Sequence, residues 1–317
     1  MIENHDFEKP VVELEKKIEE LKKFSSEKDV DLSAEISNLE KKLKSLKKGI
    51  YSNLSPWQKI MIARHPKRPT TLDYINLTMK DFVPLCGDRL FGEDRAIVSG
   101  LATFEGTKIV IMGQQKGRDT KENIARNFGC ANPEGYRKAM RLMHLGERYG
   151  LPVVCLVDTP GAYPGIGAEE RGQALAIAEN IRDMFYIKTP IVVVVIGEGG
   201  SGGALGIGVG DKVLLMENAY YSVISPEGCA AILWKDVAAR KDAAKVLKLT
   251  APDLLNLEII DEAIPEPEGG AHRNHELTAK NFKEALSRNL KELLSIDLDN
   301  LLKMRYAKFR KMGVFKE

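Results

Sequence analysis

The fold of this chain is decided by residues 151–167, which read LPVVCLVDTPGAYPGIG. The first seven residues are apolar enough for a strand covered on both faces, and a glycine-rich loop follows directly. Residues 169–185 then read as a helix, so the segment predicts a strand, a loop and a helix in succession. In open α/β sheets, ligands bind at the carboxyl ends of the strands, where this loop lies.

A second unit of the same kind follows in residues 191–204, which read IVVVVIGEGGSGGA. Outward from these two units, the patterns of apolar residues, glycine and proline predict further elements. They are a β-hairpin over residues 96–112, a helix over residues 133–149, a short helix near residues 202–208, strands over residues 213–216 and 220–224, and mainly helix from residue 226 onward. The alternation of strand and helix predicts an α/β core over residues 51–317.

Residues 1–50 predict a helical hairpin arm in front of this core. Over residues 9–48, apolar positions recur at steps of three and four, which is typical of amphipathic helices, with a polar turn at residues 25–29. The charged residues fall on solvated faces of these helices. We therefore expect the arm to serve packing or oligomerisation rather than catalysis.

The composition excludes several classes of protein. With 47 basic and 45 acidic residues among 317, the net charge of +2 gives no general attraction to polyanions. The longest aliphatic run, residues 191–196, is far shorter than the roughly 20 residues of a membrane-spanning helix, and the first residues do not resemble a secretory signal. The isolated cysteines indicate reduced thiols in the cytoplasm rather than a metal site or disulfides. They are Cys86, Cys130, Cys155 and Cys229.

The charge-poor middle of the chain is where we expect the chemistry. Residues 151–234 contain 13 of the 27 glycines but only 13 charged residues. Backbone N–H groups in both loops could stabilise oxyanions, each contributing on the order of 3 kcal/mol to a transition state. The candidate donors are Gly165, Ile166 and Gly167 in the first loop and Gly200, Gly202 and Gly203 in the second. The candidate substrate contacts beside them are Gly161, Tyr163 and Ser201.

Two alternatives to an oxyanion site stay open. The glycines could serve only the close packing of helices on strands. Residues 199–203 also match the G-x-S-x-G pattern of serine hydrolases, with Ser201 as the nucleophile. Acids and histidines follow in the order of a triad, namely Asp211, Asp236 or Asp261 and then His272 or His275. This pattern arises easily in glycine-rich sequence, and the loop lacks the Lys-Ser/Thr pair of a phosphate-binding Walker loop, so neither function is favoured.

At these residues the chain resembles a known family, the α subunit of the carboxyltransferase of bacterial acetyl-CoA carboxylase. Four segments in order carry the likeness, which extends over nearly the whole chain. They are residues 157–172 (VDTPGAYPGIGAEERG), 196–204 (IGEGGSGGA), 221–229 (YSVISPEGC) and 265–272 (PEPEGGAH). One departure is Gln114, where the family leads us to expect histidine.

The resemblance implies a crotonase/ClpP-like spiral of ββα units and a carboxyltransferase reaction. Such an enzyme moves a carboxyl group from carboxybiotin, carried by the biotin carboxyl carrier protein, to acetyl-CoA. The product is malonyl-CoA, and the step is the first committed one of fatty acid biosynthesis. Also implied are a β subunit with a zinc ribbon and most of the acetyl-CoA site, an α2β2 tetramer, and a biotin carboxylase in the full complex. No metal is expected on the chain itself.

In this reaction biotin is implied as the base, because its ureido nitrogen can take a proton from the acetyl methyl group once CO2 is released. The chain would then need mainly to hold oxyanions. The basic residues Lys116, Arg118, Lys121 and Arg126 could bind CoA phosphates, the carrier protein or an acidic partner, or could form a solvated surface. No aromatic residues are interleaved with them, so nucleic acid binding is not expected.

Overall fold

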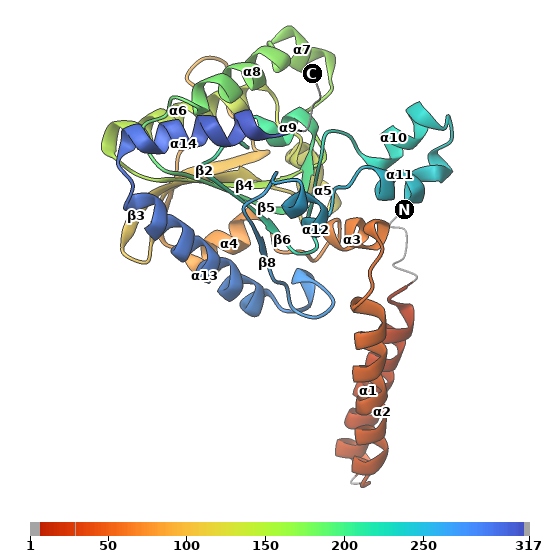
Figure 1. Cartoon of the computed structure of the whole chain (residues 1–317). Helices are drawn as coiled ribbons and strands as arrows, with labels where there is room; N and C mark the ends of the chain where they lie inside the picture. Colours follow the sequence, from red (N-terminus) through yellow and green to blue (C-terminus); the bar gives the residue numbers. More distant parts are fainter. Residues whose placement is uncertain (1–6, 29, 314–317) are drawn as a thin grey trace.

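The computed structural model describes residues 7–28 and 30–313. Figure 1 shows an α/β body and a pair of helices that projects from it as an arm. The largest cluster of buried apolar side chains lies in the body, around the strands of its sheet. No helix in these described ranges combines the length and apolar character needed to cross a membrane.

The body is built on a sheet of eight strands in the order β1-β2-β3-β4-β5-β6-β8, and β7 pairs with the end of β5. Pairs β1–β2 and β2–β3 are antiparallel, whereas β3, β4, β5, β6 and β8 run parallel. The bounds are β1 (Lys80–Pro84), β2 (Ile97–Phe104), β3 (Thr107–Gln114), β4 (Val153–Thr159), β5 (Ile191–Gly200), β6 (Lys212–Met216), β7 (Tyr220–Ser222) and β8 (Glu262–Ile264).

Strands β4 and β5 lie side by side in the middle of the sheet, and every residue of both is buried. Helices cover both faces of the sheet (Figure 1), as the unbroken apolar runs predict. On one face lie α6 (Pro133–Tyr149), α8 (Gln173–Met184) and α14 (Leu298–Lys311), and on the other lie α4 (Thr71–Thr78) and α13 (His275–Leu294). Because β4 and β5 are parallel neighbours, the loop after β4 and the helix α9 directly after β5 begin at the same edge of the sheet.

Most of the predicted body elements are confirmed. The predicted hairpin is β2 and β3, and the predicted helix over residues 133–149 is α6, which ends at Gly150 in the left-handed conformation (φ 62°). The remaining helices of the body are α3 (Pro56–Ala63), α5 (Thr120–Ala125), α7 (Ile166–Glu170), α9 (Ser201–Leu205), α10 (Pro226–Leu233), α11 (Arg240–Val246) and α12 (Ala251–Asn256).

Two predictions about the body need correction, and two strands were missed. The single helix expected over residues 169–185 is two helices, α7 and α8, because Gly172 has a left-handed backbone (φ 79°) that interrupts the helical run. The strand expected over residues 191–196 continues to Gly200, since β7 pairs with its last three residues. Strands β1 and β8 were not predicted, because they are five and three residues long and show no clear apolar alternation.

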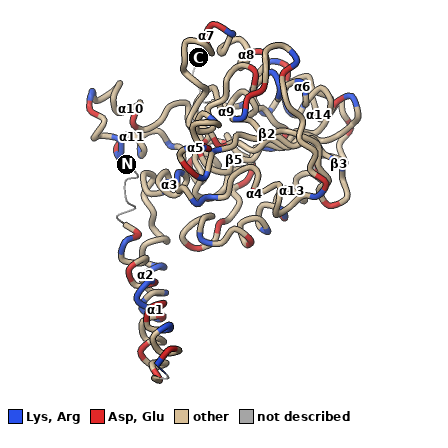
Figure 2. Tube along the Cα trace, turned by 180° about the vertical axis from the view of Figure 1, so that it is seen from behind, with Lys and Arg blue, Asp and Glu red and all other residues tan. Residues whose placement is uncertain are grey.

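The arm consists of α1 (Lys9–Lys28) and α2 (Ser33–Tyr51). The turn predicted at residues 25–29 is wrong at its beginning, because α1 continues through Lys28, and residue 29 lies outside the described residues. Charged residues follow one another along the arm (Figure 2), and ion pairs such as Lys47–Glu15 (2.6 Å) link its two helices. The boundary at residue 50 and the role of the arm in packing or oligomerisation stay predictions.

Candidate functional site

The two glycine-rich segments, glycine loop 1 (residues 158–167) and glycine loop 2 (residues 197–204), touch through their backbones. An ideal Cβ on Gly200 would lie 2.2 Å from the carbonyl oxygen of Pro160, and one on Gly203 would lie 2.4 Å from the carbonyl carbon of Gly161. These distances are far inside van der Waals contact, and the atoms concerned belong to the backbone. Glycine is therefore needed at both positions for the loops to approach each other.

Glycine loop 2, predicted as a loop, consists of the end of β5 (to Gly200) and the beginning of α9, whose first turn starts with Ser201, Gly202 and Gly203. The N–H groups of a first turn have no acceptor inside the helix, so they are available to other groups. Gly202 is partly exposed, and a Cβ there would meet only Ile177, at an ordinary contact distance of 3.7 Å. Packing therefore does not require glycine at position 202, in contrast to position 203.

The other predicted donors lie at the far end of glycine loop 1. Gly165 precedes α7, and Ile166 and Gly167 begin that helix. The side chain of Ile166 is 79% exposed, and the ring of Tyr163 lies close to Gly165, where it would clash with a Cβ. The structure thus places these residues in a solvent-facing turn, and their role as donors stays a prediction.

Ser201 has no catalytic triad among the described residues. His275 Nε2 lies 2.7 Å from the carbonyl oxygen of Lys67, and the ring of His272 stacks on that of His65 with centroids 3.7 Å apart. Neither histidine is among the mostly apolar residues that line the hollow beside Ser201. The three acids accept hydrogen bonds elsewhere, Asp211 from Arg305, Asp261 from Lys308 and Asp236 from the backbone of Ala238. The serine hydrolase alternative is therefore not supported.

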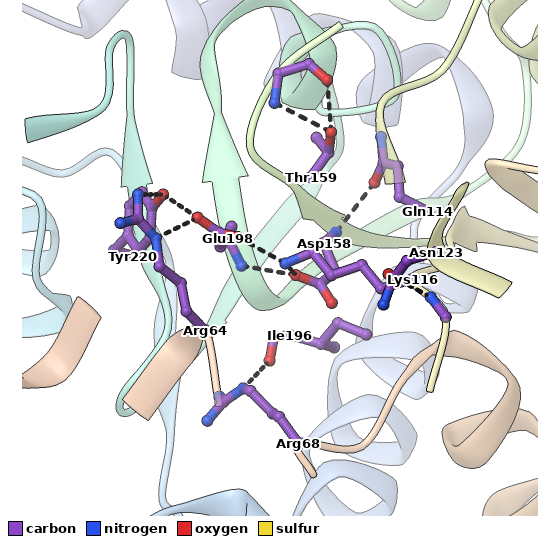
Figure 3. Close-up of polar contacts among 12 residues, drawn as sticks. Arg64, Arg68, Gln114, Lys116, Asn123, Asp158, Thr159, Ile196, Glu198 and Tyr220 are labelled. Carbon is purple, nitrogen blue, oxygen red and sulfur yellow. Dashed lines mark hydrogen bonds and ion pairs between the residues drawn. The ribbon is translucent and has the colours of Figure 1, made fainter. Parts of the chain in front are cut away.

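A buried group of charged side chains lies at the ends of β4 and β5 (Figure 3). Lys116 Nζ is 2.7 Å from Asp158 Oδ1 and 2.8 Å from Glu198 Oε1. Asp158 Oδ1 also accepts the backbone N–H of Glu198 at 2.9 Å. Because Asp158 belongs to β4 and Glu198 to β5, Lys116 ties together the two strands from which the glycine loops arise.

The second carboxylate oxygen of Glu198 is held from the opposite side. Arg64 Nε donates to Glu198 Oε2 at 2.7 Å, and the Tyr220 hydroxyl donates to the same oxygen at 2.6 Å. Arg64 also forms an ion pair with Glu227, at the start of α10. The Glu198 carboxylate thus accepts hydrogen bonds from three side chains that come from distant parts of the chain: Lys116 after β3, Arg64 after α3 and Tyr220 in β7.

These contacts decide the charge of each group. Burial by itself would raise the pKa of Glu198, but Lys116 and Arg64 outweigh it and hold that pKa at about 2. Burial would likewise lower the pKa of Lys116, yet Asp158 and Glu198 outweigh it and raise that pKa above its usual value. Burial and the neighbouring Glu198 raise the pKa of Tyr220 well above its usual range. At neutral pH Glu198 is therefore ionised, Lys116 is protonated and Tyr220 is neutral.

Arg68 forms a second buried ion pair at the same end of β5. Its Nε donates to the carbonyl oxygen of Ile196 at 2.6 Å, and its two terminal nitrogens bind both carboxylate oxygens of Glu266. Glu266 in turn accepts the backbone N–H groups of Asn218 and Ala271. The bidentate pair anchors the residue before glycine loop 2.

A hollow of about 400 Å³ opens beside this charged group and is lined by Arg64, Lys116 and Arg118 among others. The cations that line it are engaged with carboxylates, since Arg118 pairs with Asp73 and Lys116 is shared by Asp158 and Glu198. Arg118 remains half exposed. Substrate binding by Lys116 and Arg118 stays a prediction.

Sequence reasoning missed Arg64 and Tyr220 as parts of this site. No motif or fixed spacing links them to the glycines. Glu198 did carry a signal, because it is the one charged residue within residues 191–204, an otherwise apolar and glycine-rich run. A buried charge requires a partner, so the presence of a cation, though not its identity, could have been predicted.

The described residues contain no cluster of three or more His, Cys, Asp or Glu side chains that could hold a metal ion. Their four cysteines are separate and free, with Cys155 and Cys229 buried.

We expect Glu198→Gln to lower the free energy of unfolding by about 3 kcal/mol at pH 7, since the pKa of Glu198 drops on folding from its usual value of about 4.3 to about 2. A depressed carboxyl pKa stabilises the fold above the unfolded-state value, and this stabilisation is lost as the pH falls through the folded-state value. The difference from wild type should therefore shrink to about 2 kcal/mol at pH 3.5. Urea unfolding of Glu198→Gln and wild type at both pH values measures this difference in free energy of unfolding.

The matched control is Glu292→Gln, because Glu292 pairs with Lys212 at 2.8 Å but is about half exposed. Its effect should stay below about 1 kcal/mol at both pH values. A difference for Glu198→Gln that is equally small, or that grows toward acid pH, would contradict the assigned charge.

The sequence of this chain is similar to those of known proteins. A sequence model of the acetyl co-enzyme A carboxylase carboxyltransferase-like family matches residues 4–313. The chain is 58% identical over 312 residues to the acetyl-coenzyme A carboxylase carboxyl transferase subunit alpha of Geobacter metallireducens, covering 98% of both chains. It is 55% identical over 312 residues to the subunit of the same name from Thermus thermophilus, covering 98% of this chain and 99% of that one.

Two solved structures share its fold. Transcarboxylase 12S superimposes with a TM-score of 0.58 at 17% identity, over 81% of this chain and 46% of that one. The β subunit of geranyl-CoA carboxylase from P. aeruginosa gives a TM-score of 0.55 at 15% identity, over 83% of this chain and 48% of that one. The predicted crotonase-like α/β fold is thereby confirmed.

Proposed function

The chain belongs to the acetyl-CoA carboxylase carboxyltransferase family as an α subunit, and we propose that its two glycine loops hold the negative charge that develops during carboxyl transfer. The enzyme is a biotin-dependent carboxyltransferase of fatty acid biosynthesis, which makes malonyl-CoA from acetyl-CoA.

The observation that carries the proposal is the contact between the two loops. Gly200 and Gly203 let the backbone of glycine loop 2 reach that of glycine loop 1, and the first turn of α9 presents the N–H groups of Gly202 and Gly203. Amides that are fixed in advance stabilise developing charge strongly, because they need no reorganisation during the reaction. The amides of Gly165, Ile166 and Gly167 form the second set of donors, and Gly161, Tyr163 and Ser201 contact the substrate beside them.

Carboxybiotin supplies the carboxyl group and, after its release, the base. The residues of the two loops are consistent with a base that biotin supplies and that this chain does not provide. The two carboxylates nearest the loop contact, Asp158 and Glu198, share Lys116, and a pKa of about 2 makes Glu198 a poor base at neutral pH. The part of this chain is therefore to orient the reacting groups and to donate backbone hydrogen bonds to their oxygens.

The proposal extends to the assembly. The chain is active only with a β subunit, as α2β2, and that subunit carries the zinc and most of the acetyl-CoA site. The biotin carboxyl carrier protein delivers carboxybiotin, and biotin carboxylase completes the complex. Exposed Arg118, which lines the hollow, and exposed Lys121 bind CoA phosphates or the carrier protein. The names of the relatives as alpha subunits support a partner, and four free cysteines support a cytoplasmic location.

The test is Gly202→Val in the assembled α and β subunits. The new Cβ has room beside Ile177, so folding and assembly should persist, while the branched side chain screens the first-turn amides of α9. We expect carboxybiotin-dependent malonyl-CoA formation to fall by roughly 10- to 100-fold, in keeping with the loss of one oxyanion donor.

The control is Gly92→Val, because Gly92 likewise has open space around an added Cβ but lies outside both loops. Its activity should stay within about twofold of wild type, and size-exclusion chromatography should show that both variants assemble. Unchanged turnover in an assembled Gly202→Val complex would overturn the oxyanion assignment.

A further inference from the structure

Gln114 joins the two glycine loops through its side-chain amide. Its Nε2 donates to the carbonyl oxygen of Gly203 at 3.1 Å, and its Oε1 accepts the backbone N–H of Asp158 at 3.1 Å. Gln114 is the last residue of β3, next to β4, and its exposure is 0%. Figure 3 shows the amide directed at the backbone of Asp158. One buried side chain therefore bridges the beginning of glycine loop 1 and the α9 end of glycine loop 2.

Both partners of this amide are backbone groups with fixed roles. A backbone N–H only donates and a carbonyl oxygen only accepts, so the side chain must present oxygen to Asp158 and nitrogen to Gly203. The hydroxyl of Tyr136 also reaches the Gly203 carbonyl, but at 3.4 Å. On the other side, Lys116 holds the carboxylate of Asp158, so the residue that opens glycine loop 1 is held through both its N–H and its side chain.

We propose that Gln114 is a positioning residue for carboxyl transfer, which sets the separation of the two loops whose amides stabilise the developing charge. The inference rests on the proposed function, because the separation matters only if those amides take part. Gln114 is fully buried and acts through Asp158 and Gly203. A misplacement of about 1 Å in a catalytic constellation costs about 100-fold in rate, so a side chain that fixes the spacing affects turnover more than binding.

Two variants of the assembled enzyme remove the bridge in different ways. Gln114→Met keeps the length of the side chain but loses both hydrogen bonds. Gln114→Asn keeps the amide but is one methylene too short to span both partners. In both we expect kcat for malonyl-CoA formation to fall by about 10-fold or more, with KM for acetyl-CoA within about twofold of wild type.

A third variant tests for rescue by chemistry. In Gln114→His, a neutral imidazole offers one donor and one acceptor nitrogen, as the amide does. We expect its kcat to lie within about fivefold of wild type. If residue 114 only filled space, the kcat of Gln114→His would not exceed that of both Gln114→Met and Gln114→Asn.

The control is Asn289→Leu, because Asn289 is also a buried amide (5% exposed) that donates to Glu262 and to the Ala285 carbonyl, away from the loops. It should lose stability but keep kcat within about twofold. Hydrogen exchange of the complex adds a direct readout, since Gln114→Met should speed exchange in peptides that cover residues 158–167 and 197–204 and leave α13 unchanged.

The inference is overturned if folded Gln114→Met and Gln114→Asn keep kcat within twofold of wild type. It is also overturned if Asn289→Leu lowers kcat as much as the Gln114 variants do, or if the kcat of Gln114→His is no higher than that of Gln114→Met. Should Gln114→Met fail to assemble, Gln114→Asn decides by the same criterion. Loss of activity in Gly202→Val with full activity in the Gln114 variants rejects the positioning role alone. Full activity in all of them rejects the proposed function as well.

Discussion

Gly203→Ala is expected to reduce carboxyl transfer by at least about 100-fold, although it adds a single methyl group. The new Cβ would lie 2.4 Å from the carbonyl carbon of Gly161 and 2.5 Å from the nitrogen of Ala162. Both atoms belong to the backbone of glycine loop 1, which therefore has to move away from α9. The movement changes the spacing of the two sets of amides on which we expect the reaction to depend.

The neighbouring residue provides the matched control for this prediction. In Gly202→Ala the same methyl group, added one position earlier in the same helix, meets only Ile177 at 3.7 Å. We expect Gly202→Ala to keep activity within about fivefold and to unfold at the same urea concentration as wild type. Gly203→Ala should also lose about 1 to 3 kcal/mol of stability, the usual cost of overpacking.

Steady-state rates of malonyl-CoA formation by the assembled subunits measure the difference between the two variants. Hydrogen exchange in glycine loop 1 should increase in Gly203→Ala and stay unchanged in Gly202→Ala. Equal activity of the two variants would show that the loop contact has no influence on the reaction.

The fold was largely predictable, because its central strands have a clear pattern of apolar residues in the sequence. The run at residues 191–196 is unbroken and apolar, and such runs occur where a parallel strand is covered on both faces. The division between α7 and α8 was not predictable, since Gly172 could equally have stayed inside a helix. Strands β1 and β8 are short and are defined by pairing, β1 with the following strand β2 and β8 with β6, which is distant in sequence.

The site was predictable only in its glycines. Sequence shows that residues 199–203 are all small, but it does not show which glycine packs against backbone and which faces open space. The charged group and the Gln114 bridge both depend on contacts across long sequence separations, namely Arg64 with Glu198 and Gln114 with Gly203. The sequence leaves open whether Lys116 meets CoA phosphates, the carrier protein, an acidic partner or solvent, and the structure places its ammonium between Asp158 and Glu198.

Lys116→Met is expected to lower the free energy of unfolding by about 3 to 5 kcal/mol at pH 7, the largest stability effect we anticipate. The ammonium is paired with Asp158 and Glu198, and its side chain is only 20% exposed. Methionine fills similar space but leaves Asp158, a buried carboxylate, without its cation. Lys212→Met, which removes a more exposed pair with Glu292, should cost less than about 1 kcal/mol.

The pH dependence of this loss separates charge from packing. Because Asp158 and Glu198 raise the pKa of Lys116, the stability it adds is fully present below the usual lysine pKa and is lost only in strong alkali. In Lys116→Met the deficit should shrink as the pH falls, since Lys116 no longer helps to hold the pKa of Glu198 low and this carboxylate can take up a proton at a higher pH. A packing defect would give a deficit that is the same at pH 7 and pH 4.5 in urea unfolding.

A second substitution should restore part of the lost stability. Asp158→Asn in the Lys116→Met background removes the stranded charge, while the amide oxygen can still accept the N–H of Glu198. The double variant should therefore be more stable than Lys116→Met alone, even though Asp158→Asn by itself destabilises the wild type. If the stability losses of the two single variants simply add in the double variant, the two side chains are not coupled. Recovery of stability without recovery of activity is the expected result, because Lys116 also ties together the strands that carry the glycine loops.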